Sequence, residues 1–356
     1  MPNAKNQQRG RCCRCSLDAE RKRLMRPNPL VAEQVNWTQY EPDQRAGHYE
    51  SFYQRANHPS RPLAFWIRYT IFTPAGRPVE AIGELWFVLF DGETGQHVVA
   101  KQEHPIADCD FDRRAFSVRI GEATLGPARL AGGVHGVRWQ LTYASDQPPL
   151  YLLPPRLYRG GFPKAKSLVG SPLARYDGEL IVGDRRIRVG DWVGSQNHNW
   201  GTRHTDRYAF GQVAGFDNAP DSFLEVATAS NRIGPVNTPM VTLLVLRHRG
   251  QEHSLVSLWQ GIRATGRFRY FGWDFASQSP SVQVRGRIEA PPEAFTGLAY
   301  SNPPGGVKHC LNTKIARCEV EVTNRVTGTR ETLLTEHRAL FEILTDDRGH
   351  GIPIRA

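Results

Sequence analysis

The sequence predicts an all-β protein built as two antiparallel β-barrels in tandem. Three observations support this class: apolar residues alternate with a period of two in many short segments, turn-forming pairs separate these segments, and no window keeps helical periodicity beyond three turns. Many of the expected strands have polar or aromatic inward faces. Because closing a sheet into a barrel removes its exposed edges, we expect barrels rather than open sandwiches.

Residues 63–72 show the alternation most clearly. Every odd position is apolar or aromatic, whereas the even positions include Trp66, Arg68 and Thr70. This pattern is typical of a strand that is buried on one side and mixed on the other. Comparable runs occupy residues 84–90, 115–120, 137–144, 176–182, 207–216, 222–229, 240–247, 253–259, 281–288, 315–323 and 332–344, although the last run also fits a helix.

The tryptophans of these runs are expected in the barrel cores rather than on a ligand platform; they are Trp86, Trp139, Trp259 and Trp273. Turn chemistry separates the runs at Asp91-Gly92, Gly183-Asp184, Asp217-Asn218, Arg249-Gly250 and Thr327-Gly328.

The chain length suits two domains of ordinary size. With 356 residues, the chain exceeds one small β domain. We expect a disordered basic tail at residues 1–28, an N-terminal barrel at residues 29–204 and a C-terminal barrel at residues 205–356. Met25 could serve as a start codon that leaves most of the tail untranslated.

The basic charge is concentrated in the tail. Residues 1–26 hold eight basic and two acidic side chains, so this segment carries +6 of the net +10. A basic face on the folded body is therefore not expected, and nucleic-acid binding is not favoured. No apolar run approaches the roughly 20 residues that span a bilayer, so no integral membrane segment is expected, while peripheral membrane contact stays open.

The cysteines indicate a reducing compartment. Cys12, Cys13 and Cys15 lie in the tail without a second Cys/His pair at zinc-site spacing, so we expect free thiols and no metal. The chain shows no secretory signal and no disulfide framework. These features favour a cytoplasmic protein.

Residues 191–208 differ from the rest of the chain because they combine histidine, asparagine, tryptophan, arginine and aspartate within one short segment. Buried amides and imidazoles each need a hydrogen-bond partner, so this composition suits a ligand pocket better than an apolar core. His198 could exchange a proton, Asn197 and Asn199 could fix its tautomer, and Trp200 could stack on a developing cation. The alternative is a hydrogen-bonded belt between two barrels that performs no chemistry.

Residues 196–201, followed by residues 207–212, resemble the family of AttH-like proteins, carotenoid 1,2-hydratases and tocopherol-cyclase-like proteins. Residues 47–52, 65–70, 302–306 and 312–314 extend the resemblance over most of residues 45–345. The resemblance implies two lipocalin-like (calycin-like) barrels that meet at a shared interface. It also implies hydration of a double bond, or ring closure, on a polyene or terpenoid substrate without metal or redox cofactor.

In the carotenoid hydratases of this family, a histidine and a tryptophan act with a downstream carboxylate to protonate the alkene. His198 and Trp200 match the first two residues. For the carboxylate, Glu225 and Asp217 are candidates by position and Asp206 by proximity, and we take Glu225 as the expected residue.

The resulting hypothesis is a cofactor-independent hydratase or cyclase that binds a hydrophobic polyene or terpenoid-like substrate in a pocket between the barrels. The expected catalytic residues are His198, Trp200 and Glu225; the expected substrate-binding residues are Asn197, Asn199, His204, Tyr208, Arg68, Trp66 and Glu50. Arg68 either anchors a ligand carboxylate or bridges to Glu50. The alternative function is a lipocalin-type carrier or sensor of a hydrophobic molecule, and the oligomeric state is open.

Overall fold

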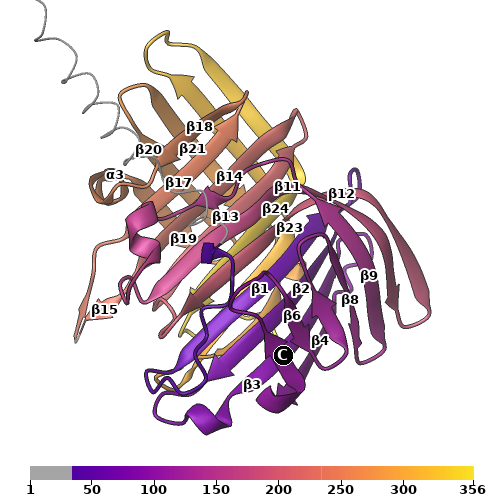
Figure 1. The fold of residues 1–356 in the computed structure, drawn as a ribbon. Helices are drawn as coiled ribbons and strands as arrows, with labels where there is room; N and C mark the ends of the chain where they lie inside the picture. The colour runs from indigo at the N-terminus through magenta and orange to yellow at the C-terminus, as the bar shows by residue number, and fades with distance from the viewer. Residues whose placement is uncertain (1–33, 234) are drawn as a thin grey trace, which may run out of the picture.

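Twelve antiparallel strands form the first sheet, which is nearly closed into a barrel (Figure 1). The computed structural model describes residues 34–233 and 235–356, so the basic tail and its cysteines lie outside the described residues. The strand order is β4-β3-β2-β1-β12-β11-β9-β8-β7-β6-β5, with β10 paired to β11. The strands are β1 (His48–Asn57), β2 (Leu63–Thr73), β3 (Ile82–Asp91), β4 (Val98–Pro105), β5 (Cys109–Phe111), β6 (Val118–Ile120), β7 (Ala123–Leu125), β8 (Arg129–Val134), β9 (Val137–Ala144), β10 (Leu150–Tyr151), β11 (Ala165–Val182) and β12 (Arg185–Gly201).

Ten further strands form the second sheet, in the order β18-β17-β14-β13-β24-β23-β21-β20-β19, with β22 paired to β23. They are β13 (Arg207–Phe216), β14 (Ala219–Ser230), β17 (Val241–His248), β18 (Gln251–Leu255), β19 (Thr265–Arg269), β20 (Gly272–Gln278), β21 (Val282–Glu289), β22 (Thr296–Ser301), β23 (Val307–Asn324) and β24 (Arg330–Thr345). A small hairpin, β15 (Arg232–Ile233) with β16 (Val236–Asn237), projects beside this sheet (Figure 1). Short helical segments are α3 (Leu258–Arg263) and the 3-10 turns Pro78–Glu80, Ile106–Asp108, Pro155–Tyr158 and Pro292–Ala294.

The expected class of two calycin-like antiparallel barrels in tandem is confirmed. The chain passes from the first sheet to the second between Gly201 and Arg207. The division into separate domains at residue 204 remains a prediction. The two sheets meet in one hydrophobic core, which contains residues from both sides of that boundary.

That shared core joins the outer face of the first sheet to the second sheet. One buried cluster contains Trp66 and Trp86 from the first sheet together with Trp273 and Phe341 from the second. Burying a large apolar side chain contributes about 1.5–3 kcal/mol, so this contact area is a principal stabilising feature. A separate cluster, which includes Phe52, fills the interior of the first barrel.

The predicted core position of Trp259 is wrong. β18 ends at Leu255, and Ser257 then caps α3: its hydroxyl accepts a hydrogen bond from the Gln260 amide, and the Gln260 side chain accepts one from the Ser257 amide. This capping box ends the strand and begins a helix, which leaves Trp259 72% exposed. Trp86, Trp139 and Trp273 are buried as expected, and residues 332–344 are part of a strand, β24.

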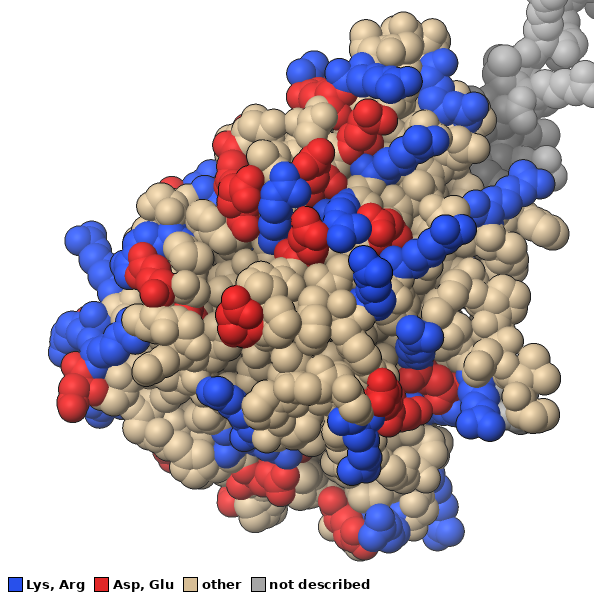
Figure 2. Space-filling view, turned by 180° about the vertical axis from the view of Figure 1, so that it is seen from behind, with Lys and Arg blue, Asp and Glu red and all other residues tan. Residues whose placement is uncertain are grey.

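The surface carries both signs of charge. In Figure 2, lysine and arginine are interspersed with aspartate and glutamate over the face shown. Within the described parts of the chain, no helix has the length and apolar character needed to cross a bilayer.

Candidate functional site

β12 presents its side chains alternately to the two sides of the first sheet, because neighbouring residues of a strand point to opposite faces. Asn197 lies toward the second sheet, where its side-chain oxygen accepts a hydrogen bond from Gln212 at 2.8 Å. Asn199 lies on the same side and lines a cavity between the sheets. His198 and Trp200 lie on the other side, with stacked rings whose centroids are 4.4 Å apart.

The cavity between the sheets has a volume of about 200 Å³. This volume equals that of about seven water molecules at roughly 30 Å³ each. The lining is mainly aromatic and apolar with a few polar groups, a composition typical of small-molecule sites. The first sheet contributes Tyr49, Tyr53, Trp66, Arg68, Ala165, Lys166, Ser167 and Asn199. The second contributes Tyr208, Phe210, Ala227, Ala229, Leu243, Tyr300 and Glu342, and the connecting segments contribute Leu152, Leu153, His204 and Thr205.

Two buried cations among the described residues line this cavity: Arg68, and Lys166, whose Nζ donates to the Gly160 and Pro163 carbonyls at 2.8 and 3.1 Å. Arg68 Nε donates to Ser51 Oγ at 2.8 Å, and the Arg68 guanidinium lies 4.4 Å from the centre of the Tyr300 ring. Burial by itself lowers the pKa of Arg68, but the nearby Tyr300, Glu84 and Glu342 raise it by more. The pKa therefore lies above its ordinary value, and the guanidinium stays charged. The sequence allowed Arg68 either to anchor a ligand carboxylate or to form an ion pair with Glu50. The ion pair does not form: Arg68 donates to Ser51, and Glu50 instead contacts His48 and His198.

Three lining residues hold a buried polar atom that has no hydrogen-bond partner among the described residues: Arg68 Nη1, Trp66 Nε1 and Asn199 Oδ1. An unsatisfied buried polar group costs about 1–3 kcal/mol, and such groups in native proteins call for an explanation such as a bound molecule. Two of the three atoms are donors. The cavity therefore suits a molecule that carries an oxygen acceptor.

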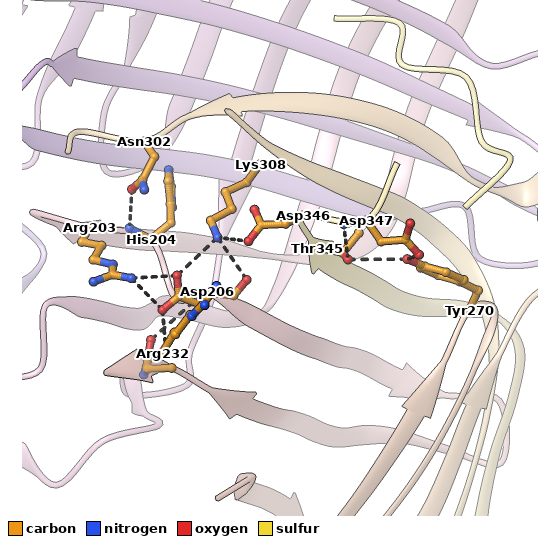
Figure 3. Close-up of polar contacts among 11 residues, drawn as sticks. Arg203, His204, Asp206, Arg232, Tyr270, Asn302, Lys308, Thr345, Asp346 and Asp347 are labelled. Atoms are coloured by element: carbon orange, nitrogen blue, oxygen red, sulfur yellow. Dashed lines mark hydrogen bonds and ion pairs between the residues drawn. The ribbon is translucent and has the colours of Figure 1, made fainter. Parts of the chain in front are cut away.

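His204 reaches the cavity from the segment that joins the two sheets. Its ring stacks on Tyr49 with a centroid distance of 3.9 Å, and its backbone N–H donates to Asn302 Oδ1 at 3.0 Å (Figure 3). Burial lowers the pKa of His204 to about 3, and the Arg68 charge lowers it in the same direction. The imidazole is consequently neutral at physiological pH.

Ion pairs fix the joining segment to the second sheet. Asp206 accepts hydrogen bonds from Arg203 at 2.8 Å and lies 3.3 Å from Lys308 Nζ, which also pairs with Asp346 at 2.7 Å (Figure 3). Lys308 is only 6% exposed. These contacts hold the segment on β23 and the end of β24, and thereby position the His204 ring.

Glu342 closes one side of the cavity. Its Oε1 accepts hydrogen bonds from Lys314 at 2.9 Å and from Asn312 at 3.1 Å, and the Tyr208 hydroxyl donates to its Oε2 at 3.5 Å. Burial raises the pKa of Tyr208, which therefore remains a neutral hydroxyl. The Lys314–Glu342 pair is neutral as a unit, so Arg68 and Lys166 give the cavity lining a net positive charge.

A buried amide network adjoins the cavity. Gln212 donates to Glu225 at 2.7 Å and accepts from Arg55 Nε at 2.8 Å. Burial raises the pKa of Glu225 to about 8, so this carboxyl is protonated at neutral pH. Ala227, two residues further along β14 and thus on the same face, lines the cavity.

His198 belongs to an ionic cluster on the other side of the sheet. Its Nε2 lies 2.7 Å from Glu50 Oε1 and its Nδ1 lies 3.1 Å from the Val35 carbonyl, while His48 Nε2 lies 2.9 Å from Glu50 Oε2. The two ring nitrogens of His198 therefore face a carboxylate oxygen and a backbone carbonyl oxygen, which are both hydrogen-bond acceptors. Burial raises the pKa of Glu50, but the hydrogen bonds from the two histidines outweigh it and lower that pKa to about 2.

The structure thus distributes the predicted site residues over three places. The inter-sheet cavity is lined by Trp66, Arg68, Asn199, His204 and Tyr208. The amide network holds Asn197 and Glu225, and the ionic cluster holds Glu50 and His198 with Trp200 stacked beside it.

Several lining residues were not predicted from sequence. Glu342 carried a usable signal, because it is a carboxylate within the otherwise apolar run 339–344. Tyr49 lies in a segment that supported the family resemblance. Tyr53, Tyr300 and Phe210 occupy ordinary strand positions, so only the packing of the two sheets identifies them.

Comparisons with solved structures match the architecture. An AttH-like protein (NE1406) from Nitrosomonas europaea superposes with a TM-score of 0.54 at 11% identity, over 86% of this chain and 94% of that chain. CghA, solved with Sch210972, superposes with a TM-score of 0.55 at 11% identity, over 84% and 89% of the two chains. This chain has the AttH-like fold. The expectation drawn from the motifs is thereby confirmed for the fold.

Two sequence relatives align with most of this chain. This chain is 25% identical to the uncharacterized protein Rv0493c of Mycobacterium tuberculosis strain H37Rv over 284 aligned residues. The alignment covers 79% of this chain and 83% of that protein. The uncharacterized protein MT0513 of strain CDC 1551 matches with the same values. No protein-family model matches the chain.

Proposed function

We propose that this protein binds an unsaturated, mainly apolar small molecule in the inter-sheet cavity and catalyses its ring closure, or the addition of water to it, without a cofactor. The observation that carries the proposal is the cavity itself. Its aromatic walls surround Arg68 and Trp66, and each of these holds a buried N–H that lacks a partner within residues 34–233 and 235–356.

The two donors specify one part of the ligand. A carbonyl, enolate or carboxylate oxygen would satisfy Arg68 Nη1 and Trp66 Nε1, and a hydroxyl could donate to Asn199 Oδ1. The remaining wall favours a planar or branched hydrocarbon, because Tyr49, Tyr300 and similar side chains offer aromatic faces.

The net positive charge of the cavity supports ring closure of a conjugated carbonyl compound better than alkene protonation. A carbocation next to the Arg68 guanidinium would be destabilised, whereas negative charge that builds up on a carbonyl oxygen would be stabilised by fixed donors. Arg68 and Trp66 would polarise the carbonyl, and the walls would hold the chain in a folded, reactive conformation.

Hydration is the second candidate, and one observation favours it. Glu225 is a protonated carboxyl at neutral pH and lies on the strand face that also carries the cavity-lining Ala227. It could act as the general acid that hydration requires. His198 would then serve as a positioning residue in the opposite ionic cluster, since it is absent from the described cavity lining.

Incubation with pseudoionone, an acyclic conjugated terpenoid ketone, tests the proposal by liquid chromatography and mass spectrometry. Ring closure yields an isomer of unchanged mass and new retention time, whereas hydration adds one water. Arg68→Met is expected to abolish either product, while Arg61→Met, a change in an exposed ion pair with Glu93, is the matched control. Bound pseudoionone recovered unchanged would indicate a carrier, and no binding would contradict the substrate class.

A further inference from the structure

The surface around α3 combines exposed apolar side chains with an adjacent groove whose lining, among the described residues, contains arginines but no acidic residue. Leu258, Trp259 and Ile262 are 65%, 72% and 45% exposed, although large apolar residues are normally covered. The three positions lie within five residues of one short helix. They therefore form a continuous apolar surface rather than scattered exposed residues.

The opposite side of α3 explains why these side chains face outward. Gly261 is buried against β17: a Cβ atom there would lie 2.7 Å from Val241 Cγ1 and 3.0 Å from Leu243 Cδ2. The helix can approach β17 this closely only through a residue without a side chain. The larger apolar residues of α3 consequently point away from the sheet.

A groove of about 970 Å³ runs beside the apolar residues, between α3 and the ends of β20 and β21. Its lining includes Arg263, Arg285 and Arg325 and no aspartate or glutamate. Arg325 donates to the Ser279 carbonyl at 2.8 Å. Glu321 lies opposite Arg285 in the strand register but is 3.9 Å from Arg330, so the groove keeps a positive charge.

We propose that α3 and this arginine groove dock the protein on an anionic phospholipid membrane. Trp259, Leu258 and Ile262 would enter the boundary between headgroups and acyl chains, and the arginines would bind lipid phosphates. The basic tail is repelled by the same arginines and does not fit as the occupant. Leucine and isoleucine offer neither stacking nor hydrogen bonds to bases, which argues against RNA.

The docking surface lies next to the candidate ligand site. Leu243, which contacts Gly261 of α3, also lines the inter-sheet cavity. If the proposed function holds, docking would bring the cavity close to a membrane in which an apolar substrate dissolves. The membrane contact itself does not depend on that function.

Flotation of the full chain with ligand-free vesicles tests this proposal. Binding is expected to vesicles of phosphatidylcholine mixed with phosphatidylglycerol and to be much weaker with phosphatidylcholine alone. Each of Arg263→Gln and Arg285→Gln is expected to weaken binding about fivefold. The triple variant Leu258→Ser/Trp259→Ser/Ile262→Ser should lose most of the binding, whereas Phe162→Ser, which alters another exposed aromatic residue, should not.

A second measurement separates α3 from the basic tail, which could also bind anionic lipid. Lipids brominated in their acyl chains should quench tryptophan fluorescence in the wild type but not in Trp259→Phe. The proposal would be overturned if the triple variant floated as well as the wild type, or if the wild type showed no quenching. It would also be overturned if single-stranded RNA displaced the protein from the vesicles while a buffer of the same salt concentration did not. Because the vesicles contain no substrate, failure of the pseudoionone assay would leave this result unaffected.

Discussion

At the scale of single residues, the pair Glu50 and His198 shows how a motif can be central to the structure without touching the cavity. Both side chains are 0% exposed and joined at 2.7 Å. Removing one partner of a buried ion pair leaves an uncompensated charge, which costs more than the pair itself contributes. The sequence motif around residue 198 thus has a clear structural role, and its catalytic role remains a proposal.

His198→Ala is expected to lower the free energy of unfolding by about 3 kcal/mol, because Glu50 would keep its charge with only His48 as an ionic partner. Urea denaturation followed by circular dichroism measures the change. The double variant Glu50→Gln/His198→Gln, which removes the charges together, should lose less. A stability loss of His198→Ala within about 0.5 kcal/mol, as at an ordinary surface site, would contradict the buried ion pair.

The raised pKa of Glu225 predicts how stability depends on pH. The folded-state pKa is about 8, against 4.5 as the ordinary value. The folded protein therefore binds the proton more tightly than the unfolded chain, so this contribution is complete below pH 4.5 and is lost as the pH rises toward 8. Glu225→Gln should flatten the pH dependence of the melting temperature over this interval. An unchanged slope would show that the carboxyl is ionised in the fold.

At the scale of elements, the segment between β12 and β13 connects the two sheets and also supplies His204 to the cavity. Its position depends on Asp206, which contacts Arg203 and the buried Lys308 (Figure 3). The segment is short, so its ion pairs fix the place of the His204 ring in the cavity wall.

Lys308→Met is expected to loosen this segment and weaken ligand binding several-fold, because Asp206 and Asp346 would lose their shared cation. Sorbate, a conjugated dienoate, serves as the probe in isothermal titration calorimetry. Arg175→Met, which breaks an exposed ion pair with Asp191, is the control. Equal affinity in both variants would mean that the segment does not shape the site.

The strands themselves were largely predictable, because alternation of apolar residues reports directly on a half-buried sheet. The error at Trp259 arose where a capping box at Ser257 and Gln260 competed with an apparent alternation. The cavity was predicted in part: Arg68, Trp66 and His204 were expected there and line it. Tyr53 and Tyr300 were not, since their approach depends on how two sheets pack, which local patterns do not encode.

At the scale of the whole molecule, the two sheets pack against each other around a shared core. A single buried cluster includes residues from both sheets, and Asn57 of β1 donates to the Lys314 carbonyl of β23 at 2.7 Å. Unfolding one barrel would expose this core and leave buried polar groups of the other without partners.

We therefore expect one cooperative thermal transition for the whole chain. Differential scanning calorimetry should give equal calorimetric and van't Hoff enthalpies, because the shared core couples the two sheets. Two resolved transitions would instead support independent domains that meet at residue 204.

The most direct test of the central claim is the titration of sorbate into the wild type, Arg68→Met and the control Arg61→Met. The inter-sheet cavity predicts saturable binding that weakens at least about tenfold in Arg68→Met, since a charge-assisted hydrogen bond contributes about 1.5–3 kcal/mol. Binding should be unchanged in Arg61→Met. Equal affinity of Arg68→Met and the wild type, in a protein that melts normally, would contradict the assignment of this cavity as the ligand site.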